Sequence, residues 1–398
     1  MNETLIRLSD NALFTSFLLY MLAMFSFLLS VTARKKQEER VEQRAKWAKI
    51  GFVITVIAVA SHLLYIIVRT IAGGHFPVSN MFEFMTFLSF SIALGFIIIF
   101  VIYRKAFTGA FALPLVIIIQ AYASMFPSEI PVLIPALQSY WLPIHVSTAA
   151  LGQGLFAVGC AAGIWYLISQ VPQDKPTRSN RTLEGVLLIV FMLVGYIITG
   201  LYFNATGYEA NFQLENGATM TYNKPALAGP YDGVLVTEGA MQPWFNIPTW
   251  MQGVKAAVKF NTIVWSFLSG IILYLLLRLI ARKRLGAVMR QWMLKTDADL
   301  VDEISYRAIA IGFPVYTLGA LLFAMIWAHE AWGRFWGWDP KEVWALITWL
   351  FYSVYLHLRL SRGWQGEKSA WLAVLGFIIV MITLVFVNLV IVGLHSYA

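Results

Sequence analysis

The sequence predicts an all-α, polytopic integral membrane protein. Of its 398 residues, 59% are hydrophobic and only 13% are charged, and the mean hydropathy is +0.69. Apolar runs long enough to cross a bilayer recur along the chain, and lipid requires the backbone polar groups of each run to be paired within a helix. We therefore predict one transmembrane helical domain over residues 1–398, with about ten spans near residues 12–33, 47–71, 80–103, 108–126, 145–170, 183–203, 259–281, 304–329, 343–360 and 370–394.

The lysines and arginines predict the orientation of these spans. The loops after the first, third, fifth, seventh and ninth spans, with their flanks, hold 22 of the 29 lysines and arginines. Because cytoplasmic loops carry an excess of these residues, we expect these loops in the cytoplasm and both termini outside it. The asymmetry accounts for most of the net charge of +8, which therefore gives no evidence for nucleic-acid binding.

The first span and the single cysteine further limit the kinds of membrane protein that the sequence can encode. Only Arg7 precedes the first span, and the cationic run at 34–36 follows it, so we expect an anchor rather than a cleaved signal peptide. Cys160 lies inside the fifth span. The chain has no dithiol of its own, so any redox work on thiols belongs to another protein.

The second span carries a polar face inside the membrane. Thr55, His62 and Arg69 recur at seven-residue spacing and so share one side of a helix. A polar face in lipid suggests a functional site. The alternative is a histidine that packs inside the protein and hydrogen-bonds to a neighbouring helix, and the sequence leaves both interpretations open.

The segment 204–258 differs from the rest of the chain because it is polar and contains four acidic residues between positions 209 and 238. We expect an extracytoplasmic loop or small insert. Alternation such as Met220-Thr221-Tyr222 is compatible with a hairpin, and a segment lying along the membrane surface is the alternative.

Tryptophan is concentrated in a short loop at residues 330–342, which we expect outside the cytoplasm. Six of the chain's fifteen tryptophans lie between positions 327 and 349. An interfacial aromatic belt is one interpretation. The glycines between the rings favour another, a flat aromatic platform for a large planar ligand. The tryptophans of the motif itself are Trp332, Trp336, Trp338 and Trp344.

The residues at the end of this loop predict the start of a helix. Asp339 is suited to the N-cap, Pro340 to the first helical position and Glu342 to the reciprocal place in a capping box. The loop is therefore predicted to lead directly into the ninth span. Along that span Trp349, Ser353 and His357 follow one another at i, i+4 spacing, which places His357 ~20 Å from Trp344.

The fifth span begins with a histidine and continues with small residues. His145 opens the span at the predicted outer surface, and Gly152, Gly159 and Gly163 line one side with Phe156, which allows close approach of another helix. The tenth span ends close to a second outer histidine, His395.

Two outer histidines beside an aromatic loop satisfy in outline what haem iron requires. An iron bound by two histidines needs them on opposite sides of one plane. The outer cations Arg334, Lys341 and Arg69 are available to pair with the two haem propionates. Snorkelling at the membrane interface is the alternative role for Arg334 and Lys341.

The motif around the loop resembles a known family. The stretch from Trp332 to Trp344, which reads Trp-Gly-Arg-Phe-Trp-Gly-Trp-Asp-Pro-Lys-Glu-Val-Trp, resembles the tryptophan-rich "WWD" signature of haem-handling proteins. Together with the contexts of His145, His357 and His395, and with the segment 74–83, it is similar to the CcsA/ResC family of the system II cytochrome c maturation pathway. The resemblance is dense over 62–170 and 304–398 and thin over 1–45 and 204–303.

The resemblance implies a function and partners. A member of this family is expected in the bacterial cytoplasmic membrane, where it forms a cytochrome c synthase, or haem lyase, with a ResB/CcsB-type protein. Haem b would pass outward and rest beneath the tryptophan loop. An apocytochrome c with a Cys-x-x-Cys-His motif would receive it by thioether formation. The segment 204–258 fits the family poorly, and we expect it to serve docking of the partner.

The resemblance also implies roles for individual residues. His145 and His395 would be the outer ligands of the haem iron, and His357 an intramembrane ligand whose opposite histidine comes from the partner chain. His62 is a second intramembrane imidazole, at a different depth from His357. No catalytic residue is assigned, because the cap role already explains Asp339. The other residues expected to contact haem are Trp332, Trp336, Trp338, Trp344, Arg334 and Asp339.

Two other classes of protein remain as alternatives. A solute transporter without haem chemistry would be expected to have discontinuous helices and internal repeats, and no convincing repeat relates the halves of this chain. An electron-transfer membrane protein with permanent haem would place histidine pairs across the bilayer within one chain, whereas only one clear outer pair is visible here.

Overall fold

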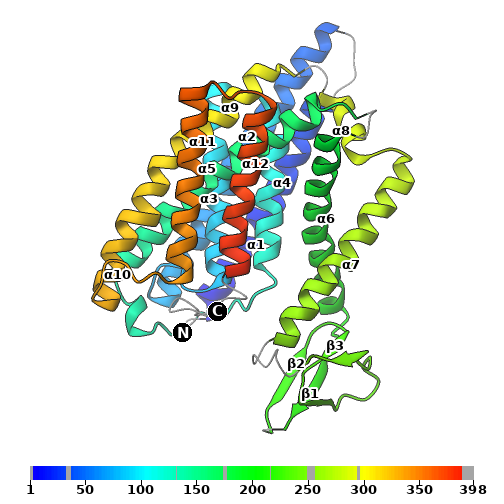
Figure 1. Ribbon diagram of the computed structural model, residues 1–398, viewed down its shortest axis with the longest axis vertical. Helices are drawn as coiled ribbons and strands as arrows, with labels where there is room; N and C mark the ends of the chain where they lie inside the picture. Colours follow the sequence, from blue (N-terminus) through cyan, green and yellow to red (C-terminus); the bar gives the residue numbers. More distant parts are fainter. Residues whose placement is uncertain are drawn as a thin grey trace. The chain divides into compact units, whose positions relative to one another are not determined.

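A computed structural model describes residues 3–32, 37–130, 132–173, 177–215, 217–248, 256–293 and 296–387. Within these residues, ten helical segments are long and apolar enough to cross a membrane, which confirms the predicted polytopic helical class. The chain divides into two compact units, residues 1–172 with 289–398 and residues 173–288. Figure 1 shows the helices of each unit.

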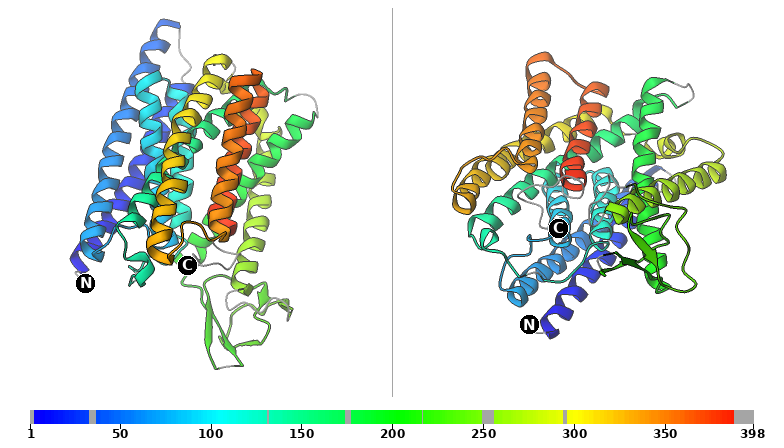
Figure 2. Two further views of the ribbon diagram at one scale, coloured as in Figure 1. Left: turned by 60° about the vertical axis from the view of Figure 1, so that its left-hand side comes forward. Right: turned by 60° about the horizontal axis from the view of Figure 1, so that its bottom comes forward.

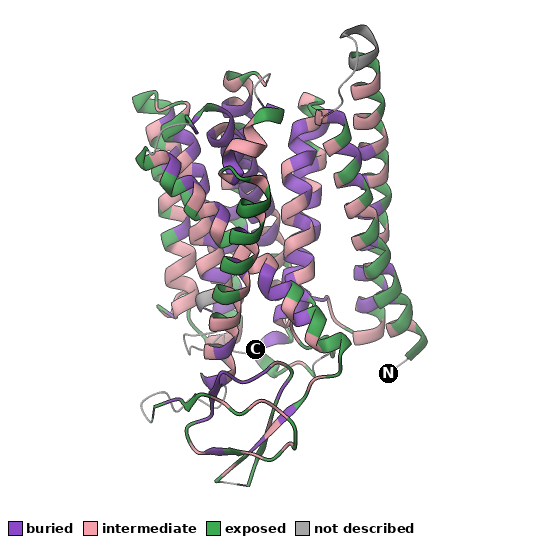
Figure 3. Cartoon of the chain, turned by 90° about the vertical axis from the view of Figure 1, so that its right-hand side faces the viewer, coloured by how far each residue is buried: buried purple, intermediate pink, exposed green. Residues whose placement is uncertain are grey.

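The first unit is a helical bundle. Helices α1 and α2 lie side by side, and buried residues line the inner faces of the bundle while exposed residues line its outer faces (Figures 2 and 3). Its elements are α1 (Glu3–Thr32), α2 (Gln37–Gly73), α3 (Met81–Tyr103), α4 (Ala106–Ala123), the 3₁₀ turn η1 (Pro135–Leu137), α5 (Trp141–Gln170), α9 (Ala298–Tyr316), the π-helix η3 (Thr317–Phe323), α10 (Ala324–Trp332), α11 (Pro340–Arg362), α12 (Glu367–Met381) and the π-helix η4 (Ile382–Val387).

Helix α5 is the most enclosed of the candidate spans and packs against α3, α4, α9, η3 and α12. Its glycines make this possible. A β-carbon at Gly152 would lie 2.6 Å from the backbone nitrogen of Tyr316, and one at Gly159 would lie 3.0 Å from the carbonyl oxygen of Ser305. The Ser305 hydroxyl also donates to the Gly159 carbonyl over 2.7 Å. The predicted close approach along this side of the fifth span is therefore confirmed.

The second unit contains α6 (Arg178–Ala205), α7 (Ala256–Ala281) and the start of α8 (Leu285–Met293). Between α6 and α7 the chain forms short strands, which the all-α prediction did not include. Strands β1 (Ala210–Leu214), β2 (Thr219–Tyr222) and β4 (Gly233–Leu235) make an antiparallel sheet in the order β2-β1-β4, and β3 (Ala228–Gly229) pairs in parallel with β5 (Phe245–Asn246).

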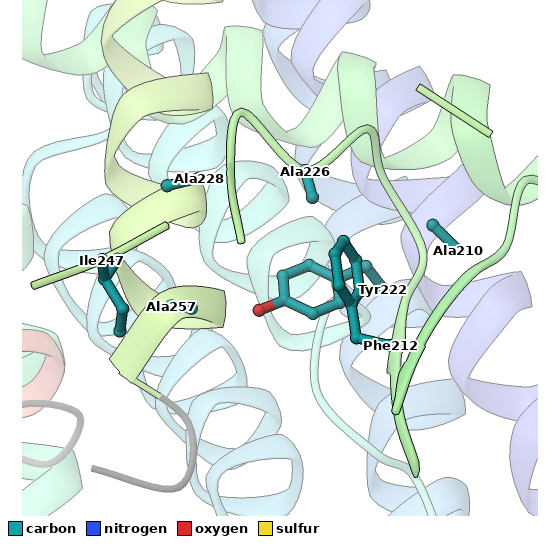
Figure 4. Close-up of a cluster of buried hydrophobic side chains, with 7 residues drawn as sticks. All are labelled: Ala210, Phe212, Tyr222, Ala226, Ala228, Ile247 and Ala257. Carbon is teal, nitrogen blue, oxygen red and sulfur yellow. The ribbon is translucent and has the colours of Figure 1, made fainter. Parts of the chain in front are cut away.

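This β-module has a small core of its own. The rings of Phe212 and Tyr222 lie 4.9 Å apart and are buried with alanines and Ile247 (Figure 4). The Asn261 side chain on α7 accepts from the Ala228 nitrogen and donates to the Ala228 carbonyl, so it ties β3 to the helix. Of the two possibilities left open for 204–258, the hairpin is the one that forms.

The close crossing of α5 with α9 gives the first prediction. Gly152→Ala forces a β-carbon against the Tyr316 backbone, and overpacking of this kind costs about 1–3 kcal/mol. Thermal unfolding in detergent should show the loss. Gly185→Ala on α6 is the matched control, because a β-carbon there meets nothing within 4 Å. Equal stability of the two variants would contradict the packing described here.

Candidate functional site

A cavity of about 200 Å³ lies within the first unit where five parts of the chain converge. The turn before α3, the first half of α5, the η3–α10 segment, the start of α11 and η4 all contribute to its wall. The residues that matter for the site are Asn80, His145, Gln153, Tyr316, Trp327, Lys341 and Thr383.

The His145 imidazole lies at this cavity with a defined orientation. Its Nδ1 is 2.9 Å from the carbonyl oxygen of Gly319, and its ring stacks on Trp327 with centroids 5.8 Å apart and planes 11° from parallel. A carbonyl oxygen only accepts, so Nδ1 carries the hydrogen in this contact. A histidine that binds a metal through one nitrogen characteristically donates from the other to a carbonyl or carboxylate.

The carbonyl that orients His145 belongs to an irregular helix. Gly319 lies in η3, and its carbonyl also accepts from the Ala324 nitrogen five residues ahead, which is the π-helical pattern. Such π-bulges occur frequently at functional sites. Gly319 packs directly against the backbone of Ala149, so the absence of a side chain is what brings η3 close enough to α5 for this hydrogen bond.

The cavity continues along α5 from His145. Ala149 and Gln153 follow it at four-residue spacing, and all three line the cavity. Gln153 is 6% exposed, and its side-chain oxygen has no hydrogen-bond partner among the residues that the structure describes. Tyr316 also lines the cavity. The cavity therefore has a polar end about 12 Å of helix from His145.

The tryptophan loop joins α10 to α11. Helix α10 ends at Gly333, which has a left-handed φ of 69°. Asp339 caps α11, and the Glu342 carboxylate accepts from the nitrogens of Asp339 and Gly337 at 3.2 and 2.7 Å. The predicted capping box is confirmed. The Glu342 carboxylate also accepts from the Gly337 nitrogen, so it holds the end of the loop as well as the start of α11.

The tryptophan rings do not form the single flat platform that the sequence suggested. The rings of Trp336 and Trp338 are 6.0 Å apart but 84° from parallel, and those of Trp327 and Trp332 are 79° from parallel. Trp332, Trp336 and Trp344 are partly buried, whereas Trp338 is 70% exposed. Trp338 also has a left-handed φ of 56°, which is rare for a bulky residue and is typical of strained functional positions.

The three candidate partners for propionates occupy different environments. Arg334 is exposed, with its guanidinium over Gly337, and Lys341 lines the cavity. Arg69 is 1% exposed, and its side chain donates to Glu83 at 2.9 Å and to the Ser128 carbonyl at 2.7 Å. The expectation that Arg69 is available to a ligand is therefore wrong, because its charge is neutralised inside the protein.

The two intramembrane histidines lie in opposite environments. His62 is fully buried, with Nδ1 3.4 Å from the Tyr20 hydroxyl and ring contacts to Tyr65 and Phe90. Of the two interpretations of this histidine, these contacts match packing inside the protein. His357 is exposed on α11. The structure does not bring these histidines together. His395 lies outside the described residues.

Some residues of the site escaped the sequence reasoning. Gly319 gives no signal, because the chain contains 28 glycines. Gln153 was a detectable signal, since it is a polar residue two helical turns after His145 in an apolar span. Trp327 was counted with the other tryptophans, but its stacking on His145 depends on a contact between distant parts of the chain.

These features define a class of protein: a polytopic helical membrane protein in which a histidine of α5 borders a cavity together with α10 and the start of α11. The family model described as Cytochrome C assembly protein matches residues 78–210 and 246–395. The chain is 34% identical to the cytochrome c biogenesis protein CcsA of Nostoc punctiforme over 334 residues, which cover 83% of this chain and 82% of the relative. It is 30% identical to the protein of the same name from Gloeobacter violaceus over 353 residues, covering 88% and 86%. The chain belongs to this family of cytochrome c assembly proteins, and within it to the CcsA proteins.

The backbone of Trp338 gives the second prediction. Because its left-handed φ favours glycine, Trp338→Gly should be more stable to unfolding than Trp338→Ala by about 1 kcal/mol. At the exposed helical position Gly185 the order should reverse, with alanine the more stable residue. Thermal unfolding of both pairs in the same detergent checks this. The same order at both positions would show that the strain at Trp338 is absent.

Proposed function

We propose that this protein binds haem b and delivers it as a subunit of a system II cytochrome c synthase. The name of its relatives, cytochrome c biogenesis protein, supports this process. The observation that carries the proposal is His145, which lines the cavity and whose Nδ1 donates to the Gly319 carbonyl, as the second nitrogen of a metal-binding histidine characteristically does. His395 supplies the ligand on the opposite face of the haem.

The environment of His145 suits part of a large planar substrate. The cavity of about 200 Å³ is smaller than the roughly 300–1,000 Å³ of pockets that enclose small molecules. A haem would therefore place one edge in the cavity and the rest against the tryptophan loop. There Trp338 offers an exposed ring, with Trp332, Trp336 and Trp344 behind it. Lys341 and the exposed Arg334 remain as cations for the propionates.

The chemistry needed from this chain is mostly positioning. In thioether formation the sulfur of a cysteine bonds to one carbon of a haem vinyl group, and the thiol hydrogen ends on the neighbouring carbon. Atoms and electrons balance without an oxidant. Holding the vinyl groups against the two thiols of an apocytochrome Cys-x-x-Cys-His motif reduces the entropic barrier to this reaction. Asp339 acts by capping α11 at the end of the loop rather than as an acid or base.

The exposed His357 supports a partner chain of the ResB/CcsB type. It lies on an outward side of α11 with Val354, which is 55% exposed, and Leu350, which is 49% exposed. A polar imidazole on such a surface is unfavourable in lipid unless another molecule covers it. We propose that a histidine of the partner opposes His357 across an intramembrane haem. The enclosed His62 is better suited to a packing role than to haem.

The proposal also places the protein in the bacterial cytoplasmic membrane, with the tryptophan loop on the outer side. The distribution of lysines and arginines predicts that the segment 204–258 and the tryptophan loop both lie outside the cytoplasm. Glu209, Glu215 and Glu238 are exposed on the β-module of that segment. We propose that it docks the partner protein.

The outer ligand gives the third prediction. His145→Gly should lose haem or cytochrome c maturation when the chain is co-expressed with a ResB-type partner, and added imidazole should partly restore it by occupying the vacated position. The Soret band per protein and the yield of cytochrome c measure this. His329→Gly is the control, because His329 is exposed near the loop and stacks on Phe335 instead of lining the cavity. Normal maturation by His145→Gly would refute the assignment.

The intramembrane ligand gives the fourth prediction. If haem travels past His357 towards the outer site, His357→Ala should lower haem at both positions, whereas His145→Ala should leave haem trapped at the inner one. Val354→Ala, one turn away on the same exposed side, controls for disturbance of α11. Full occupancy of the outer site in His357→Ala would mean that haem reaches it laterally.

A further inference from the structure

A cationic pocket lies at the end of α7 that is predicted to be cytoplasmic, within the second unit. Its volume is about 550 Å³, and it is lined by Leu275, Arg278, Leu279, Arg282, Lys283 and Arg284. Four of the six lining residues carry positive charge, and the other two are leucines. The pocket therefore combines a strongly cationic part with an apolar part.

The backbone at the end of α7 brings these cations together. Arg278 and Arg282 are one helical turn apart, and α7 ends at Ala281. Arg282 then has a left-handed φ of 53°, an unfavourable conformation for a residue with a side chain. This residue turns the chain so that Lys283 and Arg284 line the same pocket as Arg278. Like-charged residues are thus held close to one another by a strained turn.

The described residues include no carboxylate that pairs directly with the cations of the pocket. No acidic residue occurs between Arg278 and Thr296. The nearby Glu184 carboxylate accepts from the Tyr274 hydroxyl and the Gly286 nitrogen, both neutral donors. Among the residues that the structure describes, no ion pair involves the four cations of the pocket.

One donor of the pocket is buried and unsatisfied. Nη1 of Arg284 is inaccessible to solvent and has no hydrogen-bond partner within the described part of the chain. A buried guanidinium nitrogen without a partner is costly, and a planar guanidinium binds phosphate with particular efficiency. Simple snorkelling would leave this nitrogen in water.

The apolar wall identifies the kind of molecule that carries the phosphate. Leu275 is 54% exposed, Leu279 is 73% exposed and the adjacent Ile280 is 79% exposed, so this side of α7 is apolar and uncovered within the second unit, as a surface in contact with lipid would be. Basic pockets at the cytoplasmic ends of membrane helices are suited to anionic lipid head groups. We propose that the pocket binds the phosphate-containing head group of an anionic phospholipid, whose acyl chains lie along Leu275 and Leu279.

The test uses the full chain in a neutral detergent. Thermal unfolding is followed with phosphatidylglycerol or phosphatidylcholine added to the micelles, and with inorganic phosphate alone. We expect phosphatidylglycerol to raise the midpoint by several degrees in a saturable way, because a ligand that binds only the folded state stabilises it. Phosphatidylcholine should have a smaller effect, and Arg282→Gln/Lys283→Gln/Arg284→Gln should abolish the difference between the lipids.

The control removes the same number of charges elsewhere on the same predicted side of the membrane. Lys46→Gln/Lys49→Gln/Arg362→Gln changes three exposed cations of the first unit and should keep the lipid response. Equal responses of the two triple variants would overturn the proposal in favour of general surface attraction. An equal shift with inorganic phosphate would overturn the assignment to lipid.

A single, conservative substitution gives a test that does not depend on whether the triple variant folds. Arg284→Lys keeps the charge but removes the planar guanidinium, and should weaken the response to phosphatidylglycerol several-fold. Mass spectrometry of lipids that copurify with Arg284→Lys and with the wild type gives a second readout. Unchanged retention of anionic lipid by this variant would exclude Arg284 from the site.

Discussion

The close approach of α5 to the α9–η3 segment is the constraint on which the candidate site depends. Gly152, Gly312 and Gly319 leave no side chain between the helices, so the backbones meet directly. The Gly319 carbonyl consequently reaches the His145 imidazole, and the π-helical geometry of η3 aims it there. A site for a large planar ligand could be built with many aromatic arrangements, but a metal-binding imidazole needs one fixed tautomer. In this protein a helix crossing orients the His145 imidazole through its hydrogen bond to Gly319.

The loop beside the cavity shows how local signals and distant contacts differ in predictability. Asp339 and Glu342 are three residues apart, so the capping box follows from the sequence with no knowledge of the rest of the fold. The same holds for the ten spans, because lipid demands long apolar helices. The orientation of the Trp338 ring could not be predicted, since it depends on a left-handed backbone that its residue type disfavours.

Most features of the structure that the sequence did not predict depend on contacts between distant residues. His145 and Gly319 are 174 positions apart, and nothing in either sequence neighbourhood indicates their hydrogen bond. Arg69 was expected at the outer surface as a free cation, but the turn before α3 brings Glu83 back to neutralise it. The strands between α6 and α7 are two to five residues long, too short for alternation to distinguish them from a polar loop.

The two intramembrane histidines show why a helical stripe cannot decide function alone. His62 shares a helix face with Thr55 and Arg69, and that face is covered by other helices of this chain, so each of these residues is buried. His357 follows Trp349 and Ser353 on an equally regular stripe. Trp349 packs on Phe313 and donates to Thr317, yet His357 is exposed at the far end of that stripe. His62 packs inside the bundle, whereas His357 lies on an exposed side of α11. The same regular spacing therefore leads to an enclosed imidazole in one helix and an exposed one in the other.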